Sequence, residues 1–318
     1  MFIIIYVYKM NEIAEGLYAY EGIIGTNRRV AAFDLDWTLI RTISNKFVKD
    51  QDDWKLLPNR IKILRQYRDE GYTLAIFTNQ GYIGNKLSIA IKRINKIIER
   101  LEVDGLKMWV FAATGKMSIY RKPNRLMWPI LRQYIVDIDI ENSIYVGDAG
   151  GRNKNYSDDD RKYAEGIRIE FKLPEEIFPN NEIKIPNEQT MFIFVGMPGA
   201  GKSTFYHKKL EQKGWMHAKE DIVKTENKLI KEVIEGLKEG KSVAVDGTNG
   251  SRKKRRKYIN MAIKYKVPTI IIYFVRNGYE INKLRINNKV PEILYNIYYK
   301  KLEEPSMSID GVPVIEFL

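Results

Sequence analysis

The stretch VAAFDLDWTLI, residues 30–40, places two carboxylates directly after a short apolar run. Such a run, ending in polar side chains, is typical of a buried strand whose carboxyl end opens on a site. Asp34 and Asp36 stand two residues apart at this point, with a threonine close behind. Paired carboxylates in this setting suit phosphoryl transfer through an aspartyl-phosphate intermediate. The stretch therefore predicts an α/β fold with phosphatase chemistry.

A second phosphate-binding sequence, GMPGAGKST, occupies residues 196–204 and follows the apolar run MFIFV. It fits the pattern GxxxxGK[ST] and has the strand before it and the helix after it that a P-loop requires. In such a loop, backbone N–H groups curl around phosphates, the lysine reaches the terminal phosphates and the hydroxyl ligates Mg²⁺. We therefore expect ATP and Mg²⁺ at a kinase site. The expected ATP-binding residues are Gly196, Gly199, Gly201, Lys202, Ser203 and Thr204, with Ser203 also a metal ligand.

The length of 318 residues predicts about two domains, in agreement with two motifs half a chain apart. We expect a leader over residues 1–16, a phosphatase domain over 17–178, a linker over 179–189 and a kinase domain over 190–318. Each domain should be a mostly parallel sheet flanked by helices. The boundary is placed in the stretch 171–190, which is rich in Pro, Asn and Glu and poor in periodicity.

Composition excludes several classes of site and location. The chain has no cysteine, which excludes disulfides, thiolate nucleophiles and cysteine zinc sites and favours an intracellular location. The two histidines, His207 and His217, are expected in surface positions or hydrogen-bonded packing. The N-terminal run FIIIYVY lacks a basic stretch and a cleavage site and is too short for a membrane helix, so we expect a short strand or a leader and no membrane association.

A net charge of +13 predicts attraction to polyanions that weakens as salt rises. The same Lys, Ile and Asn bias is also what an A/T-rich genome gives. Charge alone therefore names no partner.

The first half alternates strand-like and helical patterns. Apolar runs at residues 29–33, 72–77, 106–112 and 143–146 are separated by helical periodicity, which is clearest over residues 85–101. This alternation predicts a parallel sheet with its site beyond the carboxyl ends of the strands. Asp34, Thr78, Asn79 and Asp148 fall at such strand ends.

The phosphatase residues can be given roles from their chemistry. A phosphate dianion approaches paired carboxylates only if a cation offsets the repulsion, so Asp34, Asp36 and Asp148 imply Mg²⁺. Asp34 would attack phosphorus, and Asp36 would protonate the leaving oxygen and then activate water. Thr78 and Lys122 would hold the phosphoryl oxygens.

The kinase needs a base for the acceptor hydroxyl, and two acids compete for that role. Asp221 lies in HAKED after the P-loop helix, and Asp246 ends the run SVAVD before GTN. We choose Asp221 as the base and expect Asp246 to position the acceptor or a metal-bound water, with Asn249 as a further acceptor contact. Arg285 lies one helical turn from a lysine in LRINNK and could reach phosphates from a lid, although an exposed basic helix gives the same pattern. The basic run at residues 252–257 is either a solvated face or a contact to a nucleic-acid backbone through Arg255 and Arg256.

In order, FDLDWTL, FTNQ, YRKP and YVGDAGGR resemble the four motifs of haloacid-dehalogenase-type phosphatases. Together with VGMPGAGKSTF, they make residues 17–318 similar to the polynucleotide kinase 3′-phosphatase family, with the phosphatase first as in the animal-type enzymes. The resemblance implies a nucleic-acid substrate, with DNA ends expected first and RNA ends as the alternative, and a functional link to a ligase. It also leads us to expect no N-terminal phosphopeptide-binding domain, since about thirty residues precede the first motif.

The resemblance also implies residue roles. Asp34 resembles the nucleophile and Asp36 the acid/base, while Asp148 resembles a metal ligand. Asp221 is similar to the kinase base and Arg285 to the lid arginine; Asp160 lies where the family has a further acid near the metal.

Three positions depart from the family pattern: Trp37 replaces a common glycine, Glu220 a common arginine and Gly247 a polar residue. Trp37 could crowd the site, stack on a nucleoside or pack within its loop, and Glu220 puts the acceptor contacts of the kinase in doubt. Two other functions stay open at this point, a fused small-molecule phosphatase and metabolite kinase, and a non-catalytic protein that binds nucleic-acid ends.

Overall fold

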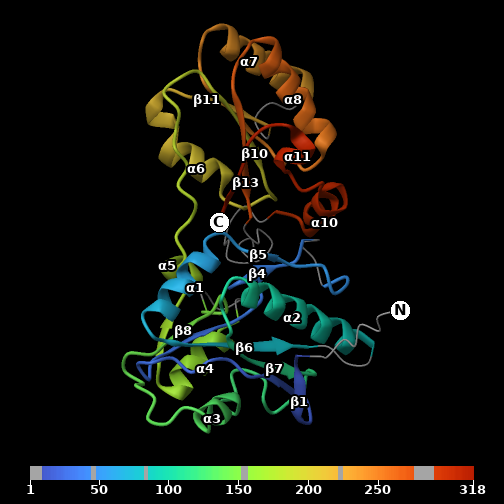
Figure 1. Ribbon diagram of the computed structural model, residues 1–318. Helices are drawn as coiled ribbons and strands as arrows, with labels where there is room; N and C mark the ends of the chain where they lie inside the picture. Colours follow the sequence, from blue (N-terminus) through green and yellow to red (C-terminus); the bar gives the residue numbers. More distant parts are fainter. Residues whose placement is uncertain (1–8, 44–47, 82–84, 152–156, 221–224, 276–289) are drawn as a thin grey trace, which may run out of the picture. The chain divides into compact units, whose positions relative to one another are not determined.

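The computed structural model describes residues 9–43, 48–81, 85–151, 157–220, 225–275 and 290–318. The chain divides into two compact units, residues 1–179 and 180–318, and each has its own sheet (Figure 1). No helix in the described ranges is long and apolar enough to cross a membrane.

A seven-stranded sheet of order β1-β2-β7-β6-β3-β8-β9 forms the first unit. The five strands from β7 to β9 run parallel, whereas β1 and β2 add an antiparallel edge beside β7. The strands are β1 (Asn11–Ala14), β2 (Leu17–Tyr20), β3 (Val30–Phe33), β6 (Thr73–Gln80), β7 (Trp109–Thr114), β8 (Ile144–Val146) and β9 (Glu170–Lys172). A separate two-stranded sheet pairs β4 (Ile40–Arg41) with β5 (Lys55–Leu56). All four strands expected from the apolar runs of the first half are present, at slightly different bounds.

Each face of this sheet has its own hydrophobic core, because successive strand residues point to opposite sides. On one face, Phe33 and Ile76 pack with the helices α1 (Arg60–Asp69) and α2 (Asn85–Val103). On the other, Ala32 and Phe77 pack with α3 (Met127–Arg132) and α4 (Asp159–Ile167). The expected helix over residues 85–101 is thus present as α2. Helices on both faces leave the carboxyl ends of the parallel strands as the place for a site.

The expected boundaries can be compared with the two units. The range 1–16 was expected to be a leader, but β1 lies within it and pairs with β2. The phosphatase domain was expected to end at residue 178, and the first unit ends at residue 179 after β9 and the short helix α5 (Pro174–Ile177). After residue 179 the chain packs on the second unit, where Asn181 Nδ2 donates to the backbone oxygen of Glu316 (2.9 Å). Pairing and packing of this kind cannot be read from local composition.

Five parallel strands in the order β11-β12-β10-β13-β14 form the sheet of the second unit. They are β10 (Met191–Val195), β11 (Met216–Lys219), β12 (Val243–Asp246), β13 (Thr269–Phe274) and β14 (Val314–Phe317). The described helices are α6 (Lys202–Lys209), the 3-10 turn η1 (Glu211–Lys213), α7 (Glu226–Lys238), α8 (Arg252–Lys264), α10 (Glu292–Lys301) and α11 (Met307–Asp310). The P-loop joins the central strand β10 to α6. Both units therefore have the expected α/β fold, a mostly parallel sheet flanked by helices.

Candidate active sites

Asp34 lies at the carboxyl end of β3 in the middle of the first sheet. Its backbone N–H donates to Val146 O of β8 (2.8 Å), which fixes the residue between two neighbouring strand ends. Its side chain is buried, and Oδ1 accepts a hydrogen bond from Lys122 Nζ (2.6 Å). Burial raises the pKa of Asp34 to about 7, with the charge of Lys122 lowering it and that of Asp160 adding to the rise. The carboxylate expected to attack phosphorus is thus in a site where negative charge needs compensation.

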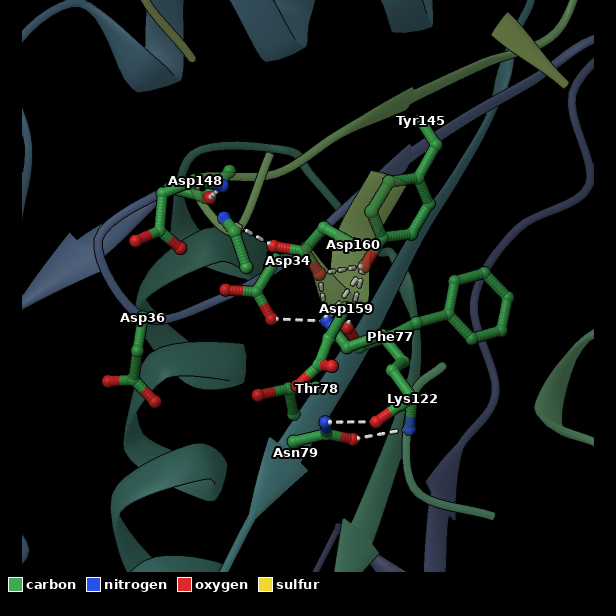
Figure 2. A network of polar contacts seen from close by, with 12 residues as sticks. Asp34, Asp36, Phe77, Thr78, Asn79, Lys122, Tyr145, Asp148, Asp159 and Asp160 are labelled. Carbon is green, nitrogen blue, oxygen red and sulfur yellow. Dashed lines mark hydrogen bonds and ion pairs between the residues drawn. The ribbon is translucent and has the colours of Figure 1, made fainter. Parts of the chain in front are cut away.

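The ammonium of Lys122 stands at the centre of the site (Figure 2). It donates to Asp34 Oδ1, to Asp160 Oδ1 (2.7 Å) and to the hydroxyl of Tyr145 (2.8 Å), so its three donors are all used. Burial alone would lower the pKa of Lys122, but the charges of Asp160 and Asp34 outweigh burial and raise it. Lys122 is therefore a fixed cation in the site.

The backbone of Lys122 is held by Asn79 of β6. Asn79 Nδ2 donates to Lys122 O (3.0 Å), and Lys122 N–H donates to Asn79 Oδ1 (2.8 Å). This pair of hydrogen bonds brings a residue from the loop after β7 to the strand end where the carboxylates lie. The four motifs, which are separated in the sequence, thus meet in one site.

Three carboxylates of this site have geometry suited to a divalent cation. Oxygen atoms of Asp34, Asp148 and Asp160 all lie within 4.8 Å of one another. Asp160 comes from α4 and is itself buried, with Oδ2 accepting from the backbone N–H of Ala149 (2.9 Å). Mg²⁺ prefers oxygen ligands and would offset the negative charge of the three carboxylates that Lys122 alone does not neutralise. The donor set fits Mg²⁺. It includes Asp160, which the sequence analysis placed only near the metal.

Glycine is required next to this carboxylate cluster. A Cβ atom at Gly147 would overlap the carboxyl group of Asp160. The glycine of YVGDAGGR therefore lets α4 bring Asp160 against the end of β8.

The Asp36 side chain lies outside this group of three carboxylates, so the expectation that Asp36 also holds the metal stays a prediction. Its Oδ2 accepts from Gln80 Nε2 (3.0 Å), and both of its oxygens accept from Arg93 Nη2 (3.0 and 2.9 Å). Figure 2 shows its carboxylate near the cluster but not joined to it. The same Gln80 amide donates to Thr78 Oγ1 (2.9 Å), so the two expected catalytic side chains are linked through one residue.

Trp37 takes the left-handed backbone conformation, with φ of 61°. Glycine adopts this region without steric cost, which explains in physical terms why glycine is common at this position in the family. The Trp37 side chain is half-buried.

In the P-loop of the second unit, the lysine side chain bonds to the backbone of the loop itself. Gly199 and Gly201 have φ of 84° and 96°, and α6 begins at Lys202 directly after the loop. Lys202 Nζ donates to the backbone oxygens of Gly196 and Met197 (2.9 Å each). The ammonium thus lies within the loop that would enclose the phosphates, while Thr204 is exposed on α6.

Asp246 lies beside the P-loop at the carboxyl end of β12. Its Oδ2 accepts from Ser203 Oγ (2.7 Å) and lies 2.9 Å from His217 Nε2. Burial opposes its charge, but the hydrogen bonds from His217 and Ser203 outweigh burial and hold the pKa of Asp246 below its ordinary value. Asp246 is thus bonded to the P-loop hydroxyl that is expected to ligate Mg²⁺, and the role of Asp221 as the kinase base stays a prediction.

Comparisons with known proteins agree with this geometry. Residues 29–178 match the family model described as polynucleotide kinase 3 phosphatase. The chain is 31% identical, over 93% of its length and 81% of the relative, to a bifunctional polynucleotide phosphatase/kinase of Schizosaccharomyces pombe. It belongs to the polynucleotide phosphatase/kinase family.

Two further relatives show how the similarity is distributed. A putative bifunctional polynucleotide phosphatase/kinase of Acanthamoeba polyphaga mimivirus is 29% identical over 91% of this chain and 85% of its own length. The polynucleotide 3′-phosphatase ZDP of Arabidopsis thaliana is 37% identical over 49% of this chain and 24% of its own length.

Two expected acceptor contacts of this family member are structural instead. Arg255 is fully buried, and its guanidinium donates to both oxygens of Asp310 (2.8 and 3.0 Å), so it cannot reach a nucleic-acid backbone. Asn249 is also buried, and its Nδ2 donates to Phe194 O (2.8 Å), which ties the loop after β12 to β10. Helical periodicity explains the first correction, since a run of six basic residues on a helix must turn at least one toward the core.

The other acceptor-side residues have mixed outcomes. Arg256 is exposed on α8 and keeps its place as a candidate backbone contact. Glu220 pairs with Lys254 of α8, and a Cβ at Gly247 would overlap the Glu220 carboxylate, so these two departures from the family pattern accommodate each other. Asp221 and Arg285 lie outside the described residues, as does Lys289, the lysine one helical turn from Arg285 in the expected lid.

Several site residues were not singled out by sequence reasoning. Gln80 and Tyr145 lie inside the quoted motifs FTNQ and YVGDAGGR, and this location could have identified them as site residues. His217 was expected to pack or lie on the surface; its ring stacks on Tyr206 with centroids 3.8 Å apart, and its bond to Asp246 had no local signature. Arg93 lies in the middle of a helix, and only the tertiary structure brings it to Asp36.

Proposed function

We propose that the protein is a bifunctional enzyme that removes a 3′-phosphate from a nucleic-acid end and transfers the γ-phosphate of ATP to a 5′-hydroxyl. The observation that carries the proposal is the presence, in one chain, of two separate groups of side chains suited to phosphate chemistry. One is the carboxylate cluster around Lys122, and the other is the P-loop with Ser203 on Asp246. Similarity to bifunctional relatives over nearly the whole chain supports the assignment of both sites to nucleic-acid ends.

In the phosphatase half, an oxygen of Asp34 attacks phosphorus as the bond from phosphorus to O3′ breaks, and the carboxyl group of Asp36 gives its proton to O3′. Asp36 then takes a proton from the water that attacks the aspartyl phosphate, which frees inorganic phosphate and Asp34. Lys122 and Thr78 hold the phosphoryl oxygens, and the position of Lys122 on Asp34 supports this role. Mg²⁺, held by Asp34, Asp148 and Asp160, would supply the charge that lets the phosphate approach.

In the kinase half, the P-loop residues 196–204 bind the phosphates of ATP. Lys202 exchanges its two backbone acceptors for phosphate oxygens, and Ser203, which is hydrogen-bonded to Asp246, would hold Mg²⁺. Asp221 takes the proton of the 5′-hydroxyl, and Arg285 contacts the transferred phosphate, on the resemblance to the family. Asp246 is bonded to Ser203 and His217, which supports giving the base role to Asp221.

The products would be a 3′-hydroxyl and a 5′-phosphate, the termini that a ligase joins. We propose breaks in DNA inside the cell as the main substrate and RNA ends as the second candidate. The net charge of +13 supports a polyanionic substrate in either case.

The test offers DNA and RNA oligonucleotides that carry a 3′-phosphate and a 5′-hydroxyl, with and without ATP. Phosphate release should occur without ATP, and 5′-labelling should require it. Asp34→Asn should abolish the first reaction and keep most of the second, and Lys202→Ala should do the reverse, because each change removes charge where only one phosphate binds.

Three results would contradict the proposal. Equal activity on a phosphorylated nucleoside and on an oligonucleotide, with no dependence on salt, would favour a small-molecule enzyme. Binding of ends without either reaction would favour a non-catalytic protein. Loss of both reactions from either single change, in a folded protein, would overturn the assignment of two separate sites.

A further inference from the structure

A fully buried arginine of α2 holds the acid/base carboxylate of the phosphatase unit. Arg93 is 0% exposed, and its Nη2 donates to both oxygens of Asp36 (3.0 and 2.9 Å). Burying a guanidinium is costly unless an anion compensates it, so the position needs a reason. The compensating anion is the carboxylate of Asp36, the group to which we assign proton transfer.

A second donor holds the same carboxylate from the neighbouring strand. Gln80, at the end of β6, donates from Nε2 to Asp36 Oδ2 (3.0 Å) and to Thr78 Oγ1 (2.9 Å). Its Oε1 in turn accepts a longer contact from Arg93 Nη2 (3.3 Å). The chain Arg93, Asp36, Gln80 and Thr78 therefore fixes the acid/base group relative to a side chain expected to hold the phosphoryl oxygens.

Without these donors, the carboxylate of Asp36 would be free to rotate, because its side chain is 37% exposed in the loop after β3. Proton transfer needs the donor within hydrogen-bond reach of the oxygen that takes the proton. A misplacement of about 1 Å can cost on the order of 10²-fold in rate. Arg93 and Gln80 thus restrict rotation of the Asp36 carboxylate, as proton transfer requires.

The remaining nitrogens of Arg93 argue against a purely structural role. Nε and Nη1 are buried and have no hydrogen-bond partner among the described residues. A buried donor without a partner destabilises a fold, so an arginine chosen for stability alone would be better satisfied. By contrast, Arg255 in the second unit uses all three of its nitrogens.

We propose that Arg93, together with Gln80, is a positioning residue of the phosphatase: it holds the Asp36 carboxyl group where it gives its proton to O3′ and later takes one from water. The inference rests on the proposed function, since it assigns Arg93 to the same reaction. It adds a residue whose hydrogen bonds among the described residues go to Asp36 and Gln80 and not to Asp34, Asp148 or Asp160.

The test uses the leaving group, because only a poor leaving group needs a proton. A 3′-phosphate oligonucleotide leaves as an alkoxide unless Asp36 protonates it, whereas p-nitrophenyl phosphate releases a stable phenolate without help. With enzyme in excess over substrate, release of either leaving group reports the first step, in which Asp34 attacks and the leaving group departs, without the later hydrolysis of the aspartyl phosphate. The variant is Arg93→Met, which keeps the volume and removes the donors.

Arg93→Met should slow oligonucleotide release by roughly 10- to 10²-fold. Its release of p-nitrophenol should stay close to that of the parent protein, and its ATP-dependent 5′-labelling should be unchanged. Arg93→Lys should lie between, since it keeps the charge but loses the guanidinium geometry. The matched control is Arg100→Met on the same helix, where Arg100 is an exposed residue paired with Asp104 and both releases should equal those of the parent.

Equal slowing with both leaving groups would mean that Arg93 supports the site as a whole, and no slowing would mean that Asp36 needs no positioning; either result overturns the inference. If Arg93→Met does not fold, Arg93→Lys decides the question by the same ratio. Asp36→Asn separates this failure from failure of the proposed function. If Asp36→Asn also lacks the dependence on leaving group, or if the parent does not release 3′-phosphate, the assigned reaction itself is wrong.

Discussion

Replacing Arg255 should destabilise the kinase unit and should not change nucleic-acid contacts directly. Its guanidinium donates to both oxygens of Asp310 and to the backbone oxygens of Gly250 and Glu303 (2.9 Å each). Arg255→Ala leaves a buried carboxylate, 1% exposed, without its cation. Removing one partner of a buried pair costs about 3–5 kcal/mol. That is a large part of the roughly 5–15 kcal/mol that stabilises an ordinary domain.

The assay follows each activity after heating, because the two units need not unfold together. At roughly 3 °C per kcal/mol for a unit of this size, the temperature of half-inactivation of the kinase should fall by about 9–15 °C. The phosphatase of the same protein should be inactivated at the parent temperature. Urea unfolding, followed by the fluorescence of the protein, gives the free energy change independently.

Two variants control for this effect. Lys253→Ala on the same helix removes an exposed side chain and should change the unfolding free energy by less than about 0.5 kcal/mol. Arg255→Met combined with Asp310→Leu removes both charges and should cost less than Arg255→Ala alone. A loss below about 1 kcal/mol for Arg255→Ala would refute the reasoning, and a flatter salt dependence of binding in the still stable variant would restore Arg255 as a nucleic-acid contact.

Three further predictions concern the chemistry and the substrate. Asp221→Asn should lower single-turnover 5′-phosphorylation by about 10²- to 10⁴-fold at saturating ATP and oligonucleotide, and near-normal turnover would remove its role as base. Affinity for single strands should fall with log salt at about −0.7 per phosphate contact, and Arg252→Ala with Arg256→Ala should flatten the slope by roughly one to two contacts; equal slopes would leave the basic run as a solvated face. In the metal-free protein, burial raises the pKa of Asp34 from 3.8 to about 7, so the folded state keeps a proton that the unfolded chain loses and the free energy of unfolding falls as pH rises between these values. Mg²⁺ should offset that loss, so the rise in Tm on adding Mg²⁺ should be larger at pH 8 than at pH 5, and equal rises would count against the Asp34 metal site.

Local sequence was sufficient to determine the elements and most of the phosphate chemistry. Apolar runs that end in polar residues gave β3, β6, β8 and β10, because a buried strand and the turn after it are specified within a few residues. The P-loop was readable for the same reason, since its glycines, lysine and hydroxyl are consecutive. Asp34, Lys122 and Asp148 were recognisable because each lies in a short motif.

The tertiary structure alone decided which side chains meet. Asp160 and Arg93 come from helices on opposite faces of the sheet, and no local pattern states that one faces Lys122 and the other Asp36. The same holds for Arg255, where six consecutive basic residues looked equivalent until helix α8 packed one of them against Asp310. A contact between distant segments depends on register, crossing angle and burial of the whole unit, and these are set by packing and not by the residues next to it in the chain.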